Sequence, residues 1–249
     1  MKLVILGIDS TEFDRKRWER LQEQLIVIEN WMDSSKALAS ERKSICEVAA
    51  ILDKLVTRDP PLTQYRGLTF AKLDVADALL DGKMSSKYPC ESWSEDDRVS
   101  AAFIDTYNQG KTAVGYVMKK NLSRNEIILN VYGLAMAMKA LARNWQVAIE
   151  RREVHPEMRR GRASRHVEEL FDFVRRATTY NELEFLVHPR PYSPKDIFKM
   201  KIGEGSSSRI NARTPNLLRI VNSHPKYSPE DLEEKWLHLK EGKIARVVT

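Results

Sequence analysis

Hydrophobic residues recur every three or four positions over much of the chain, which is the spacing of amphipathic helices. One run places Trp18, Leu21 and Leu25 on a common face, and a second continues through residues 45–56. The second helix must end before Pro60 and Pro61, because proline lacks the amide hydrogen that a helix interior needs. Similar spacing predicts further helices, over 69–81, 94–110 and 164–174.

The strongest helical pattern covers residues 124–153. Ser123 and Glu126 have the spacing of a capping box, and nearly every position from Ile127 to Ala142 is apolar or small. A helix that is apolar on all sides is typical of the centre of a fold, so we expect the other helices to pack around it. Asn130 and Lys139 are the exceptions, and Lys139 argues against burial because a buried lysine needs a partner for its charge.

Strand signals are few. Residues 2–8 and 244–248 are short apolar runs typical of strands, whereas 112–118 fit a strand or a short helix equally well. We predict a short helix near 181–187 and further helix starts at three Ser-Pro or Thr-Pro pairs, since Ser or Thr caps a helix whose first residue is often proline. Those pairs are Ser193-Pro194, Thr214-Pro215 and Ser228-Pro229.

The predicted fold is therefore mainly α: a multi-helix globular protein around a long central buried helix at about 124–153, with minor terminal β-strands. We expect a helical N-terminal lobe over 1–153 and a basic helical C-terminal lobe over 154–249, or one continuous domain. The length of 249 residues is sufficient for either arrangement.

The charge is unevenly distributed. The chain has 41 Lys and Arg against 35 Asp and Glu, and the resulting net charge of +6 falls entirely in residues 151–249. Such asymmetry favours a polyanionic partner. No apolar run reaches the roughly 18 residues of a membrane span, and no signal-peptide pattern is present, which predicts an intracellular location, cytoplasmic or nuclear, or a virion.

Two basic clusters are the candidate nucleic-acid interface, since arginine suits phosphate contacts and nearby aromatic rings can stack on bases. We predict sequence-independent binding of nucleic acid, with single-stranded RNA favoured. The expected role is structural, as in a viral nucleoprotein or matrix component that self-associates into oligomers. The first cluster consists of Arg151, Arg152, Arg159, Arg160, Arg162 and Arg165. The second consists of Lys199, Lys201, Arg209 and Arg213.

A glycine- and serine-rich loop between these basic residues is a weaker candidate, for binding phosphate. Its backbone amides could form an anion-binding nest, although an ordinary surface loop has the same composition. The loop residues are Gly203, Gly205, Ser206, Ser207 and Ser208.

No catalytic residue and no cofactor is predicted. The alternative function is an all-α, magnesium-dependent enzyme that processes nucleotides or nucleic acid, with Asp74 and Asp77 as metal ligands on one helix face. Acid pairs at this spacing are common on solvated helices, so we favour a surface role for both. A second alternative is a matrix protein whose basic face binds an anionic membrane surface.

Overall fold

The computed structural model describes residues 14–33, 39–56, 63–81, 90–107, 113–153, 155, 162–179, 184–203, 210, 212–222, 236–240 and 243–248. The chain divides into two units, each built from two separate stretches. Met1–Pro60 and Arg124–His188 form the first, here called the helical unit. Pro61–Ser123 and Pro189–Thr249 form the second, here called the sheet unit. This division differs from a single boundary near residue 153.

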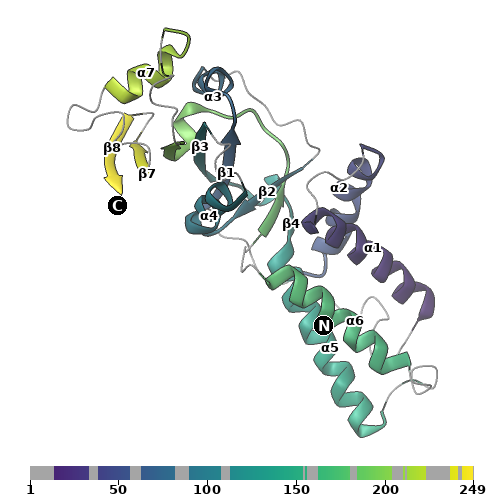
Figure 1. The fold of residues 1–249 in the computed structure, drawn as a ribbon. Coiled ribbons are helices and arrows are strands. Elements are labelled where there is room, and N and C mark those ends of the chain that lie inside the picture. The colour runs from purple at the N-terminus through teal and green to yellow at the C-terminus, as the bar shows by residue number, and fades with distance from the viewer. Residues whose placement is uncertain are drawn as a thin grey trace. The chain divides into compact units, whose positions relative to one another are not determined.

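In the helical unit, four helices accompany one pair of antiparallel strands. Helices α5 and α6 lie side by side, and α1 contacts both α2 and α6 (Figure 1). The helices are α1 (Arg15–Asp33), α2 (Ala39–Asp53), α5 (Val131–Arg151) and α6 (Arg162–Thr178), and the strands are β4 (Ile127–Asn130) and β5 (Glu184–Val187).

Aromatic rings form the centre of this unit. Trp18 of α1 and Trp145 of α5 are both buried, with ring centroids 4.9 Å apart. The His166 ring lies 4.7 Å from Trp18, and its Nδ1 is 3.1 Å from a carboxylate oxygen of Glu169. The common face predicted for Trp18, Leu21 and Leu25 is thus the packed face of α1, as expected for an amphipathic helix.

The long helix differs from the prediction at its start and in its surroundings. Residues 127–130 form β4, and α5 begins only at Val131, where the Asn130 side chain accepts a hydrogen bond of 2.7 Å from Gly133 N. Helix α5 buries one face and exposes the other, including Arg143 and Val147. It is therefore an amphipathic helix, not a central buried one.

In the sheet unit, antiparallel strands lie in the order β2-β1-β3-β6-β7-β8 (Figure 1). Three helices, α3, α4 and α7, accompany them. The strands are β1 (Thr63–Phe70), β2 (Glu91–Ser94), β3 (Val114–Asn121), β6 (Ile197–Ile202), β7 (Trp236–Lys240) and β8 (Lys243–Val248). The helices are α3 (Leu73–Leu80), α4 (Asp97–Tyr107) and α7 (Pro215–Asn222).

The two faces of this sheet are covered by different helices. Gly67 of β1 and Gly115 of β3 face α4, since a Cβ added at either would meet Ser100 or Ile104 within 2.6 Å. Tyr116 follows Gly115 and points to the opposite face, because side chains alternate along a strand. On that face, burial and then the charge of Asp77 on α3 raise the pKa of Tyr116. Helix α3 in turn contacts α7.

The mainly α prediction, and with it the all-α description, is wrong. The sheet is a major part of the fold, and the prediction missed it in part because the central strand β3 is buried on both faces over much of its length. Residues 114–118 are all buried, so they show no polar alternation that would distinguish a strand from a buried helix.

Three predicted helices are affected. Residues 69–81 contain the end of β1, a turn and α3, while 184–187 form β5. Ser193 does cap a helical turn, accepting a hydrogen bond from Lys195 N, but that turn is the short 3₁₀ segment η3 (Pro194–Asp196), which leads into β6. A good capping residue therefore started a turn and not a long helix.

Two terminal features are confirmed. Helix α7 follows Thr214, and residues 244–248 lie in β8, which pairs with β7. The predicted strand at 2–8, its pairing with the last strand, and the helix start at Ser228 lie outside the described residues.

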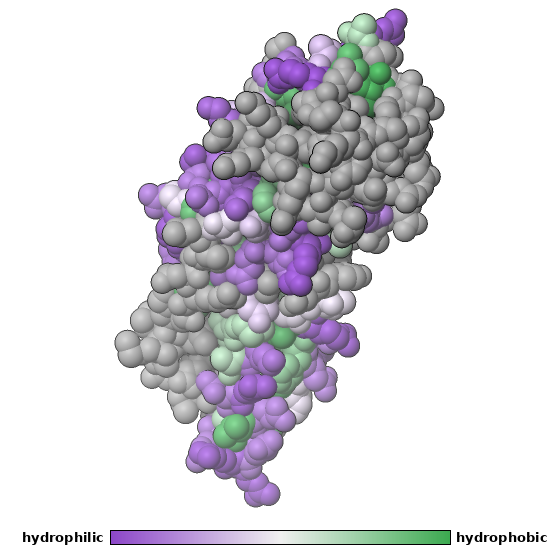
Figure 2. Space-filling view, turned by 90° about the vertical axis from the view of Figure 1, so that its left-hand side faces the viewer, coloured by the Kyte–Doolittle hydropathy of each residue, from purple (hydrophilic) through white to green (hydrophobic). Residues whose placement is uncertain are grey.

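The described residues visible in Figure 2 are mostly hydrophilic, and the hydrophobic ones among them gather in a few groups. Among the described helices, none combines the length and the apolar character that crossing a membrane requires.

Candidate functional site

The first predicted basic cluster belongs to the helical unit. Arg151 and Arg152 are exposed at the end of α5, where Arg152 adopts a left-handed backbone with φ of 57°. Arg165 is exposed and forms an ion pair of 3.1 Å with Glu169. Arg159 and Arg160 lie outside the described residues, as does the side chain of Arg162 at the start of α6.

The second cluster belongs to the sheet unit, and its lysines are compensated. Lys199 forms an ion pair with Asp97, and Lys201 Nζ lies 3.0 Å from Asp105 Oδ1. Arg213 is exposed in a turn, and Arg209 lies outside the described residues. The two clusters are thus in different units, and the nucleic-acid interface that both were expected to form stays a prediction.

Little of the predicted phosphate loop falls within the described part of the chain. Gly203 is half-buried, and its amide donates a hydrogen bond of 2.9 Å to Ala113 O. The amide of Gly203 is therefore already hydrogen-bonded to the backbone and does not point to a phosphate. Gly205 and Ser206–Ser208 lie outside the described residues.

Asp74 and Asp77 have different surroundings. Asp74 is exposed, whereas Asp77 is buried and accepts a hydrogen bond of 2.8 Å from Leu217 N and one of 3.3 Å from the Asn216 side chain. Asp77 thus holds the first turn of α7. In the described part of the chain, no group of three or more His, Cys, Asp or Glu side chains is arranged for a metal ion.

Arg66, on β1, is the residue that sequence reasoning missed. The residue is half-buried and lies on the sheet face opposite α4, and Nη1 donates a hydrogen bond of 2.6 Å to Ser92 O on β2. Its Nε is buried and has no hydrogen-bond acceptor among the described residues. The available signal was one arginine within a stretch of strand-forming residues, which periodicity alone does not single out.

The carboxylate of Glu91, which acts on Tyr192 together with Arg66, accepts hydrogen bonds from two side chains. One oxygen of Glu91 accepts a hydrogen bond of 2.5 Å from the Tyr192 hydroxyl, and the other accepts one of 3.1 Å from Trp93 Nε1. Burial raises the pKa of Tyr192 to about 12, although the Arg66 charge acts in the opposite direction. Tyr192 therefore stays protonated and donates to Glu91, and no described carboxylate forms an ion pair with Arg66.

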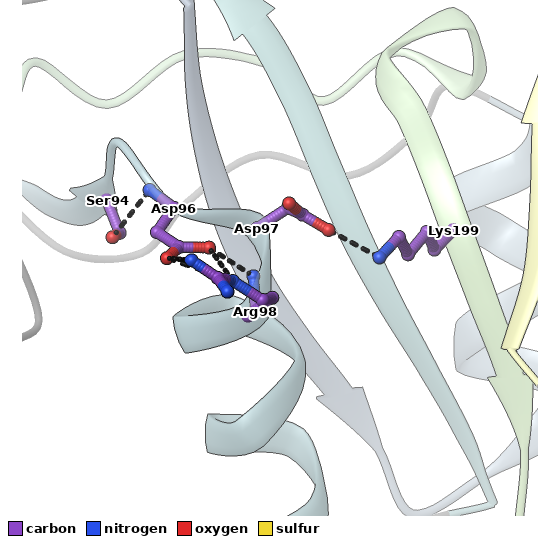
Figure 3. Close-up of polar contacts among 5 residues, drawn as sticks. All are labelled: Ser94, Asp96, Asp97, Arg98 and Lys199. Carbon is purple, nitrogen blue, oxygen red and sulfur yellow. Dashed lines mark hydrogen bonds and ion pairs between the residues drawn. The ribbon is translucent and has the colours of Figure 1, made fainter.

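The start of α4 carries a compact group of acids that are each compensated (Figure 3). The Ser94 hydroxyl accepts a hydrogen bond of 3.1 Å from Asp96 N, and the hydrogen bond from Arg98 lowers the pKa of Asp96. Asp97 pairs with Lys199 from β6 (Figure 3). The Asp97 carboxylate thus joins α4 to the sheet, and both carboxylates lie at the positive end of the helix dipole, where negative charge is stabilising.

Two buried tyrosines of the sheet unit provide a matched stability test. The Tyr116 hydroxyl is buried without a hydrogen-bond partner among the described residues, whereas that of Tyr192 donates to Glu91. We expect Tyr116→Phe to leave the free energy of unfolding unchanged or raise it by about 1 kcal/mol, and Tyr192→Phe to lower it by about 2 kcal/mol. Urea unfolding followed by circular dichroism measures both. An equal loss in the two variants would contradict the hydrogen-bonding difference.

Comparison with protein-family models, with curated proteins and with solved structures finds no match for this chain. Among the described residues, Arg66 combines a positive charge with a buried donor that lacks an acceptor, and this combination indicates a ligand.

Proposed function

We propose that the sheet unit binds a phosphorylated small molecule of the nucleotide class at Arg66. The observation that carries the proposal is the buried Nε of the half-buried residue Arg66, which lacks an acceptor among the described residues, while no described carboxylate forms an ion pair with Arg66. A buried donor left unsatisfied costs about 1–3 kcal/mol, so its presence in a folded protein calls for an explanation.

An anion supplies what this guanidinium lacks. Arginine presents a planar fork of N–H donors that matches the oxygens of a phosphate, and such charge-assisted pairs are stronger than neutral hydrogen bonds. Ser92 O holds one end of the fork, which fixes the guanidinium against β2. Glu91 accepts hydrogen bonds from Tyr192 and Trp93, and Arg66 itself hydrogen-bonds the Tyr192 side chain, so the ligand would be bound by the guanidinium donors that these contacts leave over.

The proposal is tested by ligand-induced stabilisation and calorimetry with ADP, inorganic pyrophosphate and adenosine. We expect ADP and pyrophosphate to raise the melting temperature and to bind measurably, and adenosine to do neither, because a ligand of the folded state stabilises it by mass action. Arg66→Lys removes the planar fork but keeps the charge, and we expect at least about a tenfold loss of ADP affinity.

Arg98→Lys is the matched control. Arg98 belongs to the same unit and its side chain is 85% exposed, with Asp96 as its partner. We expect this variant to bind ADP as the unmodified protein does. Binding that is unaffected by Arg66→Lys, or equal binding of adenosine, would contradict a phosphate site at Arg66.

Binding of nucleic acid remains a second proposal, as does the structural or assembly role suggested by the basic composition. The observation that favours nucleic-acid binding is an aromatic and cationic group, and not the predicted clusters. This group lies between β1, β3 and β6, on the face of the sheet opposite Arg66.

A further inference from the structure

We infer that Tyr65 and Phe198 form a stacking platform for the bases of single-stranded nucleic acid, with Lys119 beside it to contact the phosphates. The three residues come from the neighbouring strands β1, β6 and β3 of the sheet unit. This goes beyond the small-ligand site at Arg66 and does not depend on it.

The rings and the ammonium group form one cluster. The centroids of the Tyr65 and Phe198 rings are 5.5 Å apart, and Lys119 Nζ lies 5.9 Å from the first and 5.0 Å from the second. Lys199 Nζ lies 5.4 Å from the Phe198 centroid. Both rings are half-buried and Lys119 is exposed, so part of the cluster faces solvent.

A break in strand register brings Phe198 to this face. Val117 pairs with Lys199 and Met118 with Ile197, which leaves Phe198 as the extra residue between them. A bulge of this kind redirects a side chain and is over-represented beside functional sites. Without it, simple alternation would place Phe198 on the face opposite Lys199, away from Tyr65.

The charges around the platform leave one cation in excess. Asp97 pairs with Lys199 and Asp96 with Arg98, while no described carboxylate forms an ion pair with Lys119. Burial, followed by the charges of Asp97 and Asp96, raises the pKa of Tyr65, so its phenol stays neutral. Lys119 is therefore the cation that complements a phosphate backbone.

Single-stranded nucleic acid fits this combination of groups. Stacking of a base on an aromatic side chain contributes about 1–3 kcal/mol and tolerates any sequence, since every base has a flat π face. A lysine beside the rings tracks the backbone and makes binding sensitive to salt. The expected partner is therefore bound without sequence specificity.

The test is a fluorescence-anisotropy titration of the whole chain with labelled oligouridylate RNA of 12 nucleotides, at several salt concentrations. Phe198→Leu keeps apolar volume but removes the ring, and we expect it to weaken binding by at least about fivefold, the lower end of a stacking contribution. Lys119→Ala should weaken binding and make the dependence of log affinity on log salt shallower by about one unit.

Lys120→Ala is the matched control for charge. Lys120 follows Lys119 on β3, points to the other face and lies 3.8 Å from Asp196. Lys120→Ala removes the same charge as Lys119→Ala. We expect its RNA binding to stay within about twofold of the unmodified protein, as for a cation that does not contact the nucleic acid. Equal losses for Lys119→Ala and Lys120→Ala would show a dependence on net charge only and overturn the platform.

Two further outcomes separate this inference from its rivals. RNA binding that is unchanged in folded Phe198→Leu protein overturns the proposal, as does binding to phosphatidylserine vesicles without binding to RNA. Arg66→Lys should alter ADP binding and leave RNA binding intact, because Tyr65 and Arg66 point to opposite faces of β1. Failure of one site is thus distinguishable from failure of the other.

Discussion

Gly67→Ala is expected to lower the free energy of unfolding of the sheet unit by about 3 kcal/mol. A Cβ at this position would lie 2.5 Å from Ser100 O and 3.2 Å from Ile104 Cγ1. The first of these atoms belongs to the backbone of α4, so the contact cannot be relieved by rotating a side chain. The helix would have to move away from the sheet, and its apolar face would lose packing.

Urea unfolding followed by circular dichroism measures the effect, with Ala102→Ser as the control. Ala102 is exposed on α4, and we expect its substitution to change stability by less than about 0.5 kcal/mol. A loss below about 1 kcal/mol in Gly67→Ala would contradict the close approach of α4 to β1.

Gly115 offers an internal check on the same packing. A Cβ there would lie 2.4 Å from Ile104 Cγ2, a side-chain atom that truncation removes. In a double-mutant cycle, Gly115→Ala combined with Ile104→Ala should therefore cost less than the sum of the two single changes. Additive costs would show that the two residues do not compete for space.

Asp77→Ala is expected to lower the free energy of unfolding by about 2 kcal/mol, because the carboxylate caps α7 from another helix. Asp77 is only 6% exposed, and its Oδ1 accepts a hydrogen bond of 2.8 Å from Leu217 N, within the first turn of α7. Removing it leaves that amide without its buried acceptor and takes a negative charge from the positive end of the helix.

Asp74→Ala is the control on the same helix, since Asp74 is exposed, and we expect a change below about 0.5 kcal/mol. Both variants are measured by chemical unfolding, and magnesium is added in a second series. Equal effects of the two variants would contradict the capping role. Stabilisation by magnesium that needs both carboxylates would restore the metal-site interpretation.

Local sequence patterns were sufficient where one face of an element meets solvent. The spacing of Trp18, Leu21 and Leu25 predicted α1, and all three side chains are buried. Thr214 before Pro215 predicted α7 for an equally local reason, the chemistry of a helix start. The same reasoning failed at Ser193, because capping chemistry is shared by a helix and a single 3₁₀ turn.

The candidate sites were less predictable because their geometry joins distant parts of the chain. Tyr192 and Glu91 are 101 residues apart, and their hydrogen bond is part of what leaves Arg66 without a carboxylate. Lys199 and Asp97 are 102 residues apart, so the count of basic residues could not show that the lysine is compensated. The bulge that directs Phe198 toward Tyr65 likewise depends on strand pairing.

The sequence by itself determined the amphipathic helix α1, the helix start at Thr214-Pro215 and the concentration of positive charge after residue 150, since these follow from neighbours along the chain. Only the tertiary structure decided that 114–118 and 127–130 are in strands, because burial on both faces removes the polar alternation that identifies a strand. It also decided which charged groups are paired, because an ion pair forms between residues that are adjacent in space and not in sequence.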